Sequence, residues 1–165
     1  MAWDSQLQVL GEVVLAALLG ALIGIDRELA DKPAGLRTHM LVAGAAALLL
    51  GVSDALVQHF ALSTDINLIR AGMIRADPFR VIEAIITGVS FLGAGTIIRR
   101  ERAEQVEGLT TAASILFSAG VGICVALRQR LLAAGVTILA LLILRGVKLI
   151  DRWMDRWRES DEHPG

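Results

Sequence analysis

The 165-residue chain is poor in the residues on which several classes of protein depend. It has one cysteine, no tyrosine, three histidines and only 4% aromatic residues. A single cysteine excludes an intrachain disulfide, and because Cys124 lies inside an apolar run, we interpret it as a core residue rather than a reactive thiol. The shortage of aromatic rings argues against a module that stacks nucleic-acid bases, so we expect no nucleic-acid partner.

Motifs of the common enzyme classes are also missing. Gly93 and Gly95 form a GxG after an apolar run, but the third glycine and a βαβ context are absent, which excludes a dinucleotide fold. The sequence has no Walker A motif and no metal-type Cys/His spacing, and His39, His59 and His163 are scattered along it. We therefore expect no catalytic residues and no enzymatic activity.

Apolar residues are what the chain has in excess. They make up 55% of it, the mean hydropathy is +0.61, and they occur in blocks of about twenty, which indicates a membrane protein. The opening MAWDSQ has no basic region, so we do not expect a cleaved signal peptide. The sequence predicts an all-α membrane protein, with one transmembrane domain over residues 1–150 and a short basic cytoplasmic tail over residues 151–165. The five expected spans are residues 7–25, 39–57, 78–98, 109–127 and 131–150.

Basic residues predict the orientation of these spans. The loops after the first and third spans, together with the tail and the basic C-terminal end of the fifth span, hold eleven Lys and Arg residues, whereas the other connections and the start of the third span hold five. Cytoplasmic loops carry the excess of positive charge, so we expect the N-terminus outside and the C-terminus inside.

Two stretches of the chain are related to each other. Residues 19–38 align with residues 92–111 without a gap, with ten identities in twenty positions, and both contain Arg-Glu followed by Gly-Leu-x-Thr at the same separation. The first four spans therefore read as a parallel two-helix repeat about an axis along the membrane normal, with both charged loops on the cytoplasmic side. In each copy we expect Gly to turn the chain and Thr to cap the next helix through its hydroxyl.

The two charged loops are the first candidate site. Their mixed charges suit an ion-pair network between the hairpins or a docking face for another protein, although a merely solvated surface fits them too. Among the charged residues of these loops are Asp26, Arg27, Glu28, Asp31, Arg37, Arg99, Arg100, Glu101, Arg102, Glu104 and Glu107.

Three carboxylates within the spans are the second candidate site. Glu12, Asp54 and Glu83 all fall in the outer third of their predicted helices. Charged groups are costly in hydrocarbon, and a hydrated divalent cation such as Mg²⁺ needs only one or two carboxylates. These three could share such an ion, or they could point in different directions and reach the headgroups.

Small residues recur every fourth position in the first and fourth spans. Such stripes let helix backbones approach closely, either within one chain or across the seam of a homodimer. The residues are Ala16, Gly20, Gly24, Ser114, Ser118, Gly122 and Ala126.

The connection over residues 58–77 could form a short interfacial helix, with Arg70 and Arg75 turned to headgroups. It ends in Asp77 and Pro78, an N-cap followed by proline at the first helical position.

Several segments resemble one known family. GALIGIDRE followed by AGLRTHMLV, then DPFRVIEAIITGVSFLGAGTIIRR and VEGLTTAASI, resemble the MgtC/SapB family of bacterial inner-membrane proteins. The resemblance implies a multi-pass protein of the cytoplasmic membrane with five transmembrane helices and a link to growth under magnesium limitation. Virulence-associated members carry a cytoplasmic C-terminal domain, and the sequence here, which stops at Gly165, resembles a short form. The positions that match the family's motifs, with Arg100 added as the counterpart of Arg27, are Asp26, Arg27, Glu28, Gly35, Leu36, Arg37, Thr38, Asp77, Pro78, Arg80, Gly93, Gly95, Arg99, Arg100, Gly108, Leu109, Thr110 and Thr111.

The resemblance also implies a mode of action. Virulence members look like regulators that bind other membrane proteins, including the F-type ATP synthase. Our first hypothesis is a non-enzymatic membrane protein that binds a partner through the paired loops. The alternative is a transporter or channel for Mg²⁺ or another cation that uses Glu12, Asp54 and Glu83. No carboxylate lies near the midplane of a span, where transporter sites usually lie, which favours binding.

Overall fold

The computed structural model describes residues 3–63, 78–100 and 105–161, with side chains over residues 3–58, 79–97 and 106–146. This part of the chain is helical apart from one short hairpin, which confirms the all-α class. The elements in chain order are α1 (Trp3–Glu28), α2 (Leu36–Ser63), α4 (Pro78–Ala94), β1 (Ile98–Arg100), β2 (Gln105–Glu107), α5 (Leu109–Ala126) and α6 (Arg130–Asp161). The predicted interfacial helix over residues 66–74, with Arg70 and Arg75, and the cap at Asp77 lie outside the described residues.

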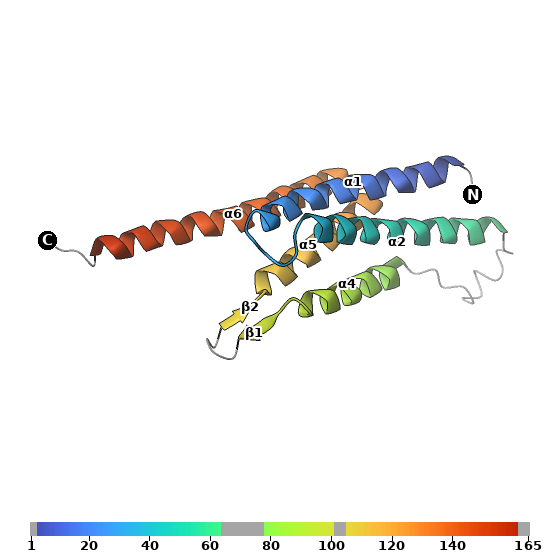
Figure 1. Ribbon diagram of the computed structural model, residues 1–165. Helices are drawn as coiled ribbons and strands as arrows, with labels where there is room; N and C mark the ends of the chain where they lie inside the picture. Colours follow the sequence, from blue (N-terminus) through green and yellow to red (C-terminus); the bar gives the residue numbers. More distant parts are fainter. Residues whose placement is uncertain (1–2, 64–77, 101–104, 162–165) are drawn as a thin grey trace.

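Successive helices run in alternating directions (Figure 1). The loop between α1 and α2 and the β1–β2 hairpin lie at the same end of the bundle, and α6 extends past them. We call this the loop end, and the opposite end, where the chain begins, the N-terminal end. Two helical hairpins with their turns on one side is the arrangement that the sequence predicts. The axis between them and the orientation in the membrane stay predictions.

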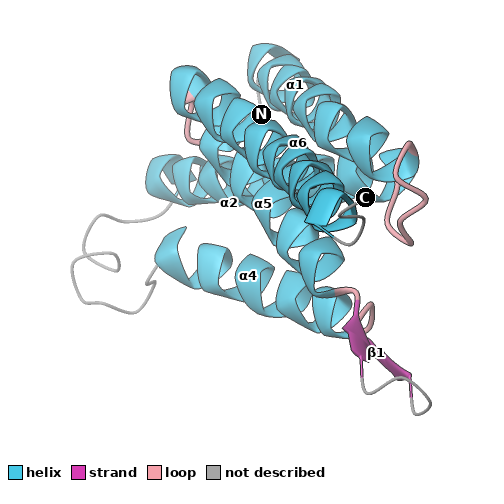
Figure 2. Cartoon of the chain, turned by 90° about the vertical axis from the view of Figure 1, so that its left-hand side faces the viewer, coloured by secondary structure: helices cyan, strands magenta, loops and turns pink. Residues whose placement is uncertain are grey.

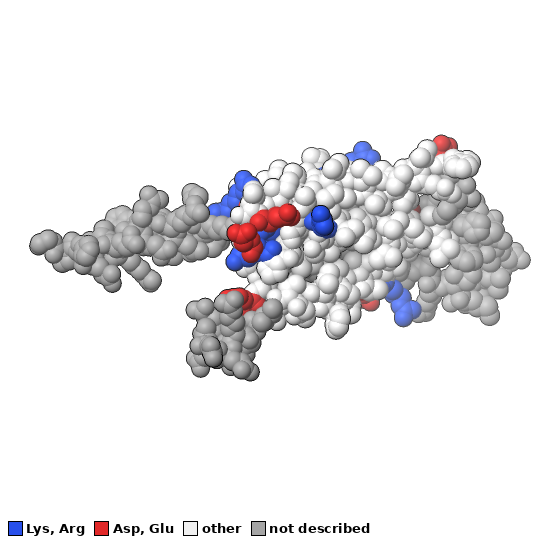
Figure 3. Space-filling model, in the orientation of Figure 1, with Lys and Arg blue, Asp and Glu red and all other residues white. Residues whose placement is uncertain are grey.

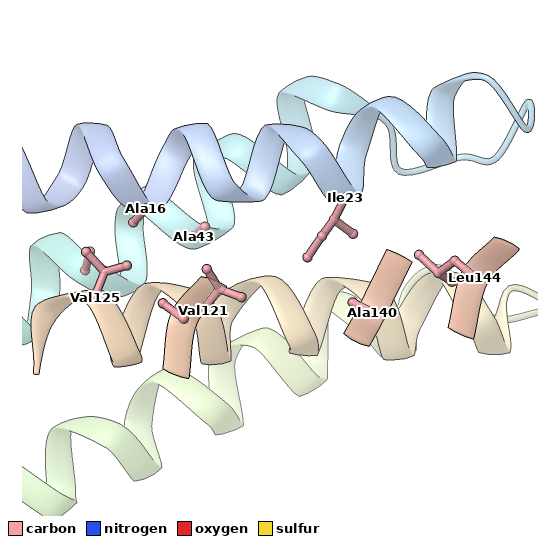
Figure 4. Close-up of a cluster of buried hydrophobic side chains, with 9 residues drawn as sticks. Ala16, Ile23, Ala43, Val121, Val125, Ala140 and Leu144 are labelled. Atoms are coloured by element: carbon pink, nitrogen blue, oxygen red, sulfur yellow. The ribbon is translucent and has the colours of Figure 1, made fainter. Parts of the chain in front are cut away.

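The core forms where α1, α2, α5 and α6 meet. The α1 helix packs most extensively against α2, and α5 packs against both. One buried cluster takes residues from all four helices, and Figure 4 shows how its side chains converge. Its labelled members are Ala16, Ile23, Ala43, Val121, Val125, Ala140 and Leu144.

Glycines let these helices approach closely. A Cβ added to Gly20 would lie 2.5 Å from the carbonyl oxygen of His39, and one added to Gly24 would lie 2.6 Å from the Cα of Leu36. On α5, a Cβ at Gly122 would run into the carbonyl oxygen of Ala43. The predicted stripes of small residues therefore serve packing between helices of the same chain.

Three of the described helices are long and apolar enough to cross a membrane. They lie at Trp3–Glu28, Leu36–Gln58 and Leu109–Ala126. The α4 helix has 17 residues, so at 1.5 Å per residue it is about 26 Å long against about 30 Å of hydrocarbon. The first, second and fourth predicted spans are thus supported, and the third and fifth stay predictions.

The predicted third span is wrong at its C-terminal boundary. The sequence predicts a helix to residue 98, but α4 ends at Ala94. The backbone N–H of Thr96 bonds to the carbonyl of Gly93 at 2.9 Å, which tightens the last turn. The chain then forms a strand pair in which Ile98 faces Glu107. The run of charged residues after Ile98 cannot continue an apolar helix, and a local hairpin satisfies its backbone instead.

The two turns of the sequence repeat differ in structure. Gly108 adopts a left-handed backbone, with φ of 94°, and turns the chain into α5 as predicted. The predicted threonine cap is wrong for α5, because its N-cap is Gly108, without a side-chain bond, and Thr111 is buried inside the helix. The α2 helix is capped by Glu28, whose carboxylate accepts a hydrogen bond from the backbone N–H of Leu36 at 2.8 Å.

Candidate functional site

A cluster of charged side chains, two of them buried, lies at the loop end, where α1 approaches α6. Asp26 and Arg27 lie in the last turn of α1 and are only 5% and 2% exposed. Asp26 Oδ2 lies 3.3 Å from Arg27 Nη2, and Asp26 Oδ1 accepts a hydrogen bond from Arg145 Nε at 2.9 Å. We call Asp26, Arg27 and Arg145 the buried ion cluster after its two buried members, since the Arg145 side chain is exposed. One carboxylate here bridges two guanidinium groups and ties α6 to the end of α1.

The buried ion cluster is costly to maintain. Among the described residues, Arg27 Nε is a buried donor without a hydrogen-bond partner. Leaving such a donor unsatisfied costs about 1–3 kcal/mol, and a buried ion pair is itself weak evidence for stability. Locally unfavourable choices of this kind are expected at functional sites.

A second polar contact links α2 to α5 at the same end. His39 is fully buried, its Nδ1 lies 2.8 Å from the carbonyl oxygen of Gly35, and its Nε2 lies 3.1 Å from Ser114 Oγ. Because a carbonyl only accepts, Nδ1 carries a proton. Ser114 Oγ also lies 2.8 Å from the carbonyl of Thr111, so its single proton has two acceptors within reach. We call His39 and Ser114 the histidine bridge.

The surface above these buried groups carries both signs of charge. Glu28, Asp31, Lys32 and Arg37 are exposed on the α1–α2 loop and the first turn of α2. Figure 3 shows acidic and basic side chains gathered there, beside a broad uncharged surface over the middle of the bundle. We call these four residues the loop-end charged surface. It can meet a partner of mixed charge, whereas the uncharged surface suits the bilayer.

The structure separates the predicted loop residues into two groups. Asp26, Arg27 and Thr111 are buried, so they support the loop end rather than contact a partner directly. Arg37, Leu109 and Thr110 are exposed, and Gly35, Leu36, Thr38 and Gly108 are half-buried. The side chains of Arg99 and Arg100, and residues Glu101, Arg102 and Glu104, lie outside the described part, so the predicted network between the two loops stays a prediction.

The three carboxylates predicted to share a cation have separate surroundings. Glu12 is 7% exposed; its Oε1 lies 3.5 Å from Arg128 Nε and accepts a hydrogen bond from Gln8 Nε2. Asp54 and Glu83 are exposed, and Asp54 accepts a hydrogen bond from Gln58. Within the described ranges, which include all three, no group of three or more His, Cys, Asp or Glu is placed to hold a metal ion. The structure therefore does not bring these three carboxylates together, and Glu12 has Arg128 as its charged neighbour.

A hollow of about 410 Å³ opens at the N-terminal end, beside Arg128, the charged neighbour of Glu12. Asp54, Gln58 and Arg128 line it, together with apolar residues of α2 and the α5–α6 turn. Arg128 lies in that turn and adopts a positive φ of 60°. The hollow carries both signs of charge, unlike the acidic cation site expected from the sequence.

Sequence reasoning missed the partners of the buried groups. From the sequence, His39 is one of three scattered histidines and Ser114 only a small packing residue, and Arg145 is not singled out. The signal available was the polar residue itself within an apolar helix, since such residues face the protein interior. Nothing in the sequence pairs His39 with Ser114 across 75 positions.

Comparison with known proteins assigns the family. The family model described as "MgtC family" matches residues 13–153. The chain is 35% identical to an uncharacterized protein of Haemophilus influenzae, over 90% of this chain and 59% of that protein. It is 34% identical to the putative magnesium transporter YhiD of Escherichia coli K12, over 80% of this chain and 57% of that protein.

A third relative is protein MgtC of Salmonella typhimurium, which is 38% identical over 78% of this chain and 48% of that protein. The chain therefore spans about half to three fifths of the length of these relatives. No solved structure matches it. The family match over most of the chain, together with these relatives and the apolar helices, shows that the chain belongs to the MgtC family of membrane proteins, a family with a link to magnesium.

Proposed function

We propose that this chain is a non-enzymatic multi-pass protein of a bacterial cytoplasmic membrane that serves magnesium homeostasis by binding and modulating another membrane protein. The contact is the loop-end charged surface: Glu28, Asp31, Lys32 and Arg37. The family's link to magnesium supports the process, and the resemblance to partner-binding members supports the mode of action. A membrane complex such as the F-type ATP synthase is the kind of partner that this resemblance suggests.

One observation carries the proposal: the exposed charged residues lie on a loop that hydrogen bonds to the adjoining helices hold in place. Glu28 bonds to the first backbone N–H of α2, and Asp26 holds both Arg27 and Arg145. A surface that is already ordered loses less conformational entropy on binding than a free loop does. Because Arg27 is buried, its role in this scheme is to support the loop, and Lys32 and Arg37 supply the positive charge that meets the partner.

The test is capture of the partner from native membranes by the full-length chain. In the Lys32→Gln, Arg37→Gln double variant we expect capture of the ATP synthase to fall about tenfold, since each charge contributes up to about 1 kcal/mol. Arg130→Gln, an exposed arginine at the N-terminal end, is the matched control and should capture as the wild type does. Equal capture by the double variant and the control would reject this surface as the contact.

Cation transport is the second candidate function, because one relative is named a putative magnesium transporter. Glu12 is the buried carboxylate that could serve it. The buried face of α1 weighs against an ion path along that helix, because it has no charged group between Glu12 and Asp26. The buried residues there are Ala16, Gly20, Ile23 and Gly24. Purified chain in liposomes should pass Mg²⁺ if this function holds, with Glu12→Gln lowering the flux and Glu83→Gln, at an exposed position, as the control.

A further inference from the structure

A large apolar groove separates α2 from α4. It has a volume of about 760 Å³ and is lined along α2 from Leu41 to Leu56 and along α4 from Arg80 to Leu92. It exists because α4 packs more extensively against α5 than against α2. Figure 2 shows α4 on the outside of the bundle, beside α2.

The dimensions of the groove suit a hydrocarbon chain. The twelve steps from Arg80 to Leu92 extend about 18 Å along α4, and one leaflet accounts for about half of the 30 Å of hydrocarbon. An α-helix with its side chains is about 10 Å wide, far wider than a single acyl chain. A single acyl chain, in contrast, can follow an apolar groove of this length.

One residue gives the groove a charged end. Among its lining residues, Arg80 and Ser53 are the two with polar side-chain groups, and the others are Gly, Ala, Val, Ile and Leu. Arg80 is exposed in the first turn of α4, at the N-terminal end of the bundle. In the part of the chain that the structure describes, it forms no ion pair.

If α4 enters the hydrocarbon of one leaflet at its first residue, Arg80 lies at the depth of the lipid headgroups. A guanidinium forms strong, often bidentate hydrogen bonds to phosphate oxygens. Glu83 is not among the lining residues, so Arg80 is the charged side chain among the described residues that line the groove.

We propose that the groove between α2 and α4 binds an anionic phospholipid, with one acyl chain along α2 and α4 and the phosphate at Arg80. The lipid covers the apolar face that α4 leaves open. A second copy of the chain is the competing occupant. The two differ in their dependence on charge, because only the lipid needs Arg80.

The experiment is native mass spectrometry of the full-length chain, purified in detergent and titrated with phosphatidylglycerol or with phosphatidylcholine of the same acyl chains. Four variants separate the parts of the site. Arg80→Gln removes the charge, and Arg130→Gln is its control. Gly88→Leu fills the groove, where an added Cβ meets no atom within 4 Å, and Gly135→Leu is the control at another open glycine.

We expect the wild type to retain phosphatidylglycerol about fivefold more than phosphatidylcholine. Arg80→Gln should lower phosphatidylglycerol retention by about fivefold, to the level of phosphatidylcholine, whereas Arg130→Gln should not. Gly88→Leu should lower retention of both lipids, and Gly135→Leu of neither. Equal effects of Arg80→Gln and Arg130→Gln would overturn the proposal. A dimer that Gly88→Leu converts to monomer, with no preference between the two lipids, would also overturn it and assign the groove to a second copy.

Discussion

Replacing Asp26 by Asn should destabilise the chain by about 3–5 kcal/mol. The change removes the charge that compensates Arg27, whose side chain is 2% exposed and already has one unsatisfied donor among the described residues. Breaking a buried pair from one side costs this much because the other charge is left in a medium of low polarity. The same substitution also weakens the bond from Arg145, which is 2.9 Å long.

Two further variants separate burial from simple charge pairing. The Arg145 side chain is 65% exposed, so Arg145→Gln should cost less than about 1 kcal/mol, as exposed pairs do. Replacing both buried partners, Asp26→Leu with Arg27→Met, should recover most of the loss, because no charge is then left buried. The costs of Asp26→Leu alone and of Arg27→Met alone should therefore sum to more than the cost of the double change.

The assay is SDS-induced unfolding of the purified full-length chain in mixed micelles, followed by far-ultraviolet circular dichroism. The midpoint should fall strongly for Asp26→Asn, slightly for Arg145→Gln, and little for the double variant. If Asp26→Asn costs no more than Arg145→Gln, then the buried ion cluster is not the compensated charge site described above. If the cost of the double variant equals the sum of the costs of Asp26→Leu alone and Arg27→Met alone, the same conclusion follows.

Four more substitutions test the close approach of α5 to α2, the turn before α5 and the histidine bridge in the same assay. Gly122→Ala should lower the free energy of unfolding by about 1–3 kcal/mol, because the added Cβ would strike a carbonyl of α2. Gly120→Ala is its control and should be neutral or stabilise by up to about 1 kcal/mol, because its Cβ meets open space. Equal costs for the two substitutions would contradict the packing argument. Gly108→Ala should cost at least about 1–2 kcal/mol, because φ there is 94°, and an unchanged midpoint would show that the turn tolerates a side chain. Ser114→Ala should cost about 1–3 kcal/mol by leaving the buried His39 Nε2 without its partner, and a neutral result would remove the bridge as a structural link.

The helices could be predicted from the sequence because the apolar blocks are long and interrupted by glycine and charge. The start of α5 was predicted at Leu109, where Gly108 turns the chain, and Pro78 stands at the first position of α4. The end of α4 could not be predicted, since Ile97 and Ile98 continue the apolar block although the chain has left the helix. Pairing across the strands fixes this boundary, and pairing depends on residues nine positions apart.

The candidate site was predicted only in outline. The charged loops were found from the sequence, but charge alone does not tell a buried residue from an exposed one. Asp26 and Arg27 face inward because α6 brings Arg145 beside them, 119 positions away. The carboxylate trio shows the opposite outcome: residues at equal depth, Glu12 and Asp54, point to different neighbours because depth does not fix the direction around a helix axis.

The length of α6 has a consequence for how the chain could transmit force. Its 32 residues form a continuous rod of about 48 Å, which exceeds the hydrocarbon thickness by about 18 Å. The rod is held near its start by Ala133 in the core and near its middle by the bond from Arg145 to Asp26. The far end of α6 projects beyond the other helices (Figure 1). A force on this end would tilt or rotate the helix about that bond. A displacement of that far end would therefore reach the base of the α1–α2 turn through the bond between Arg145 and Asp26.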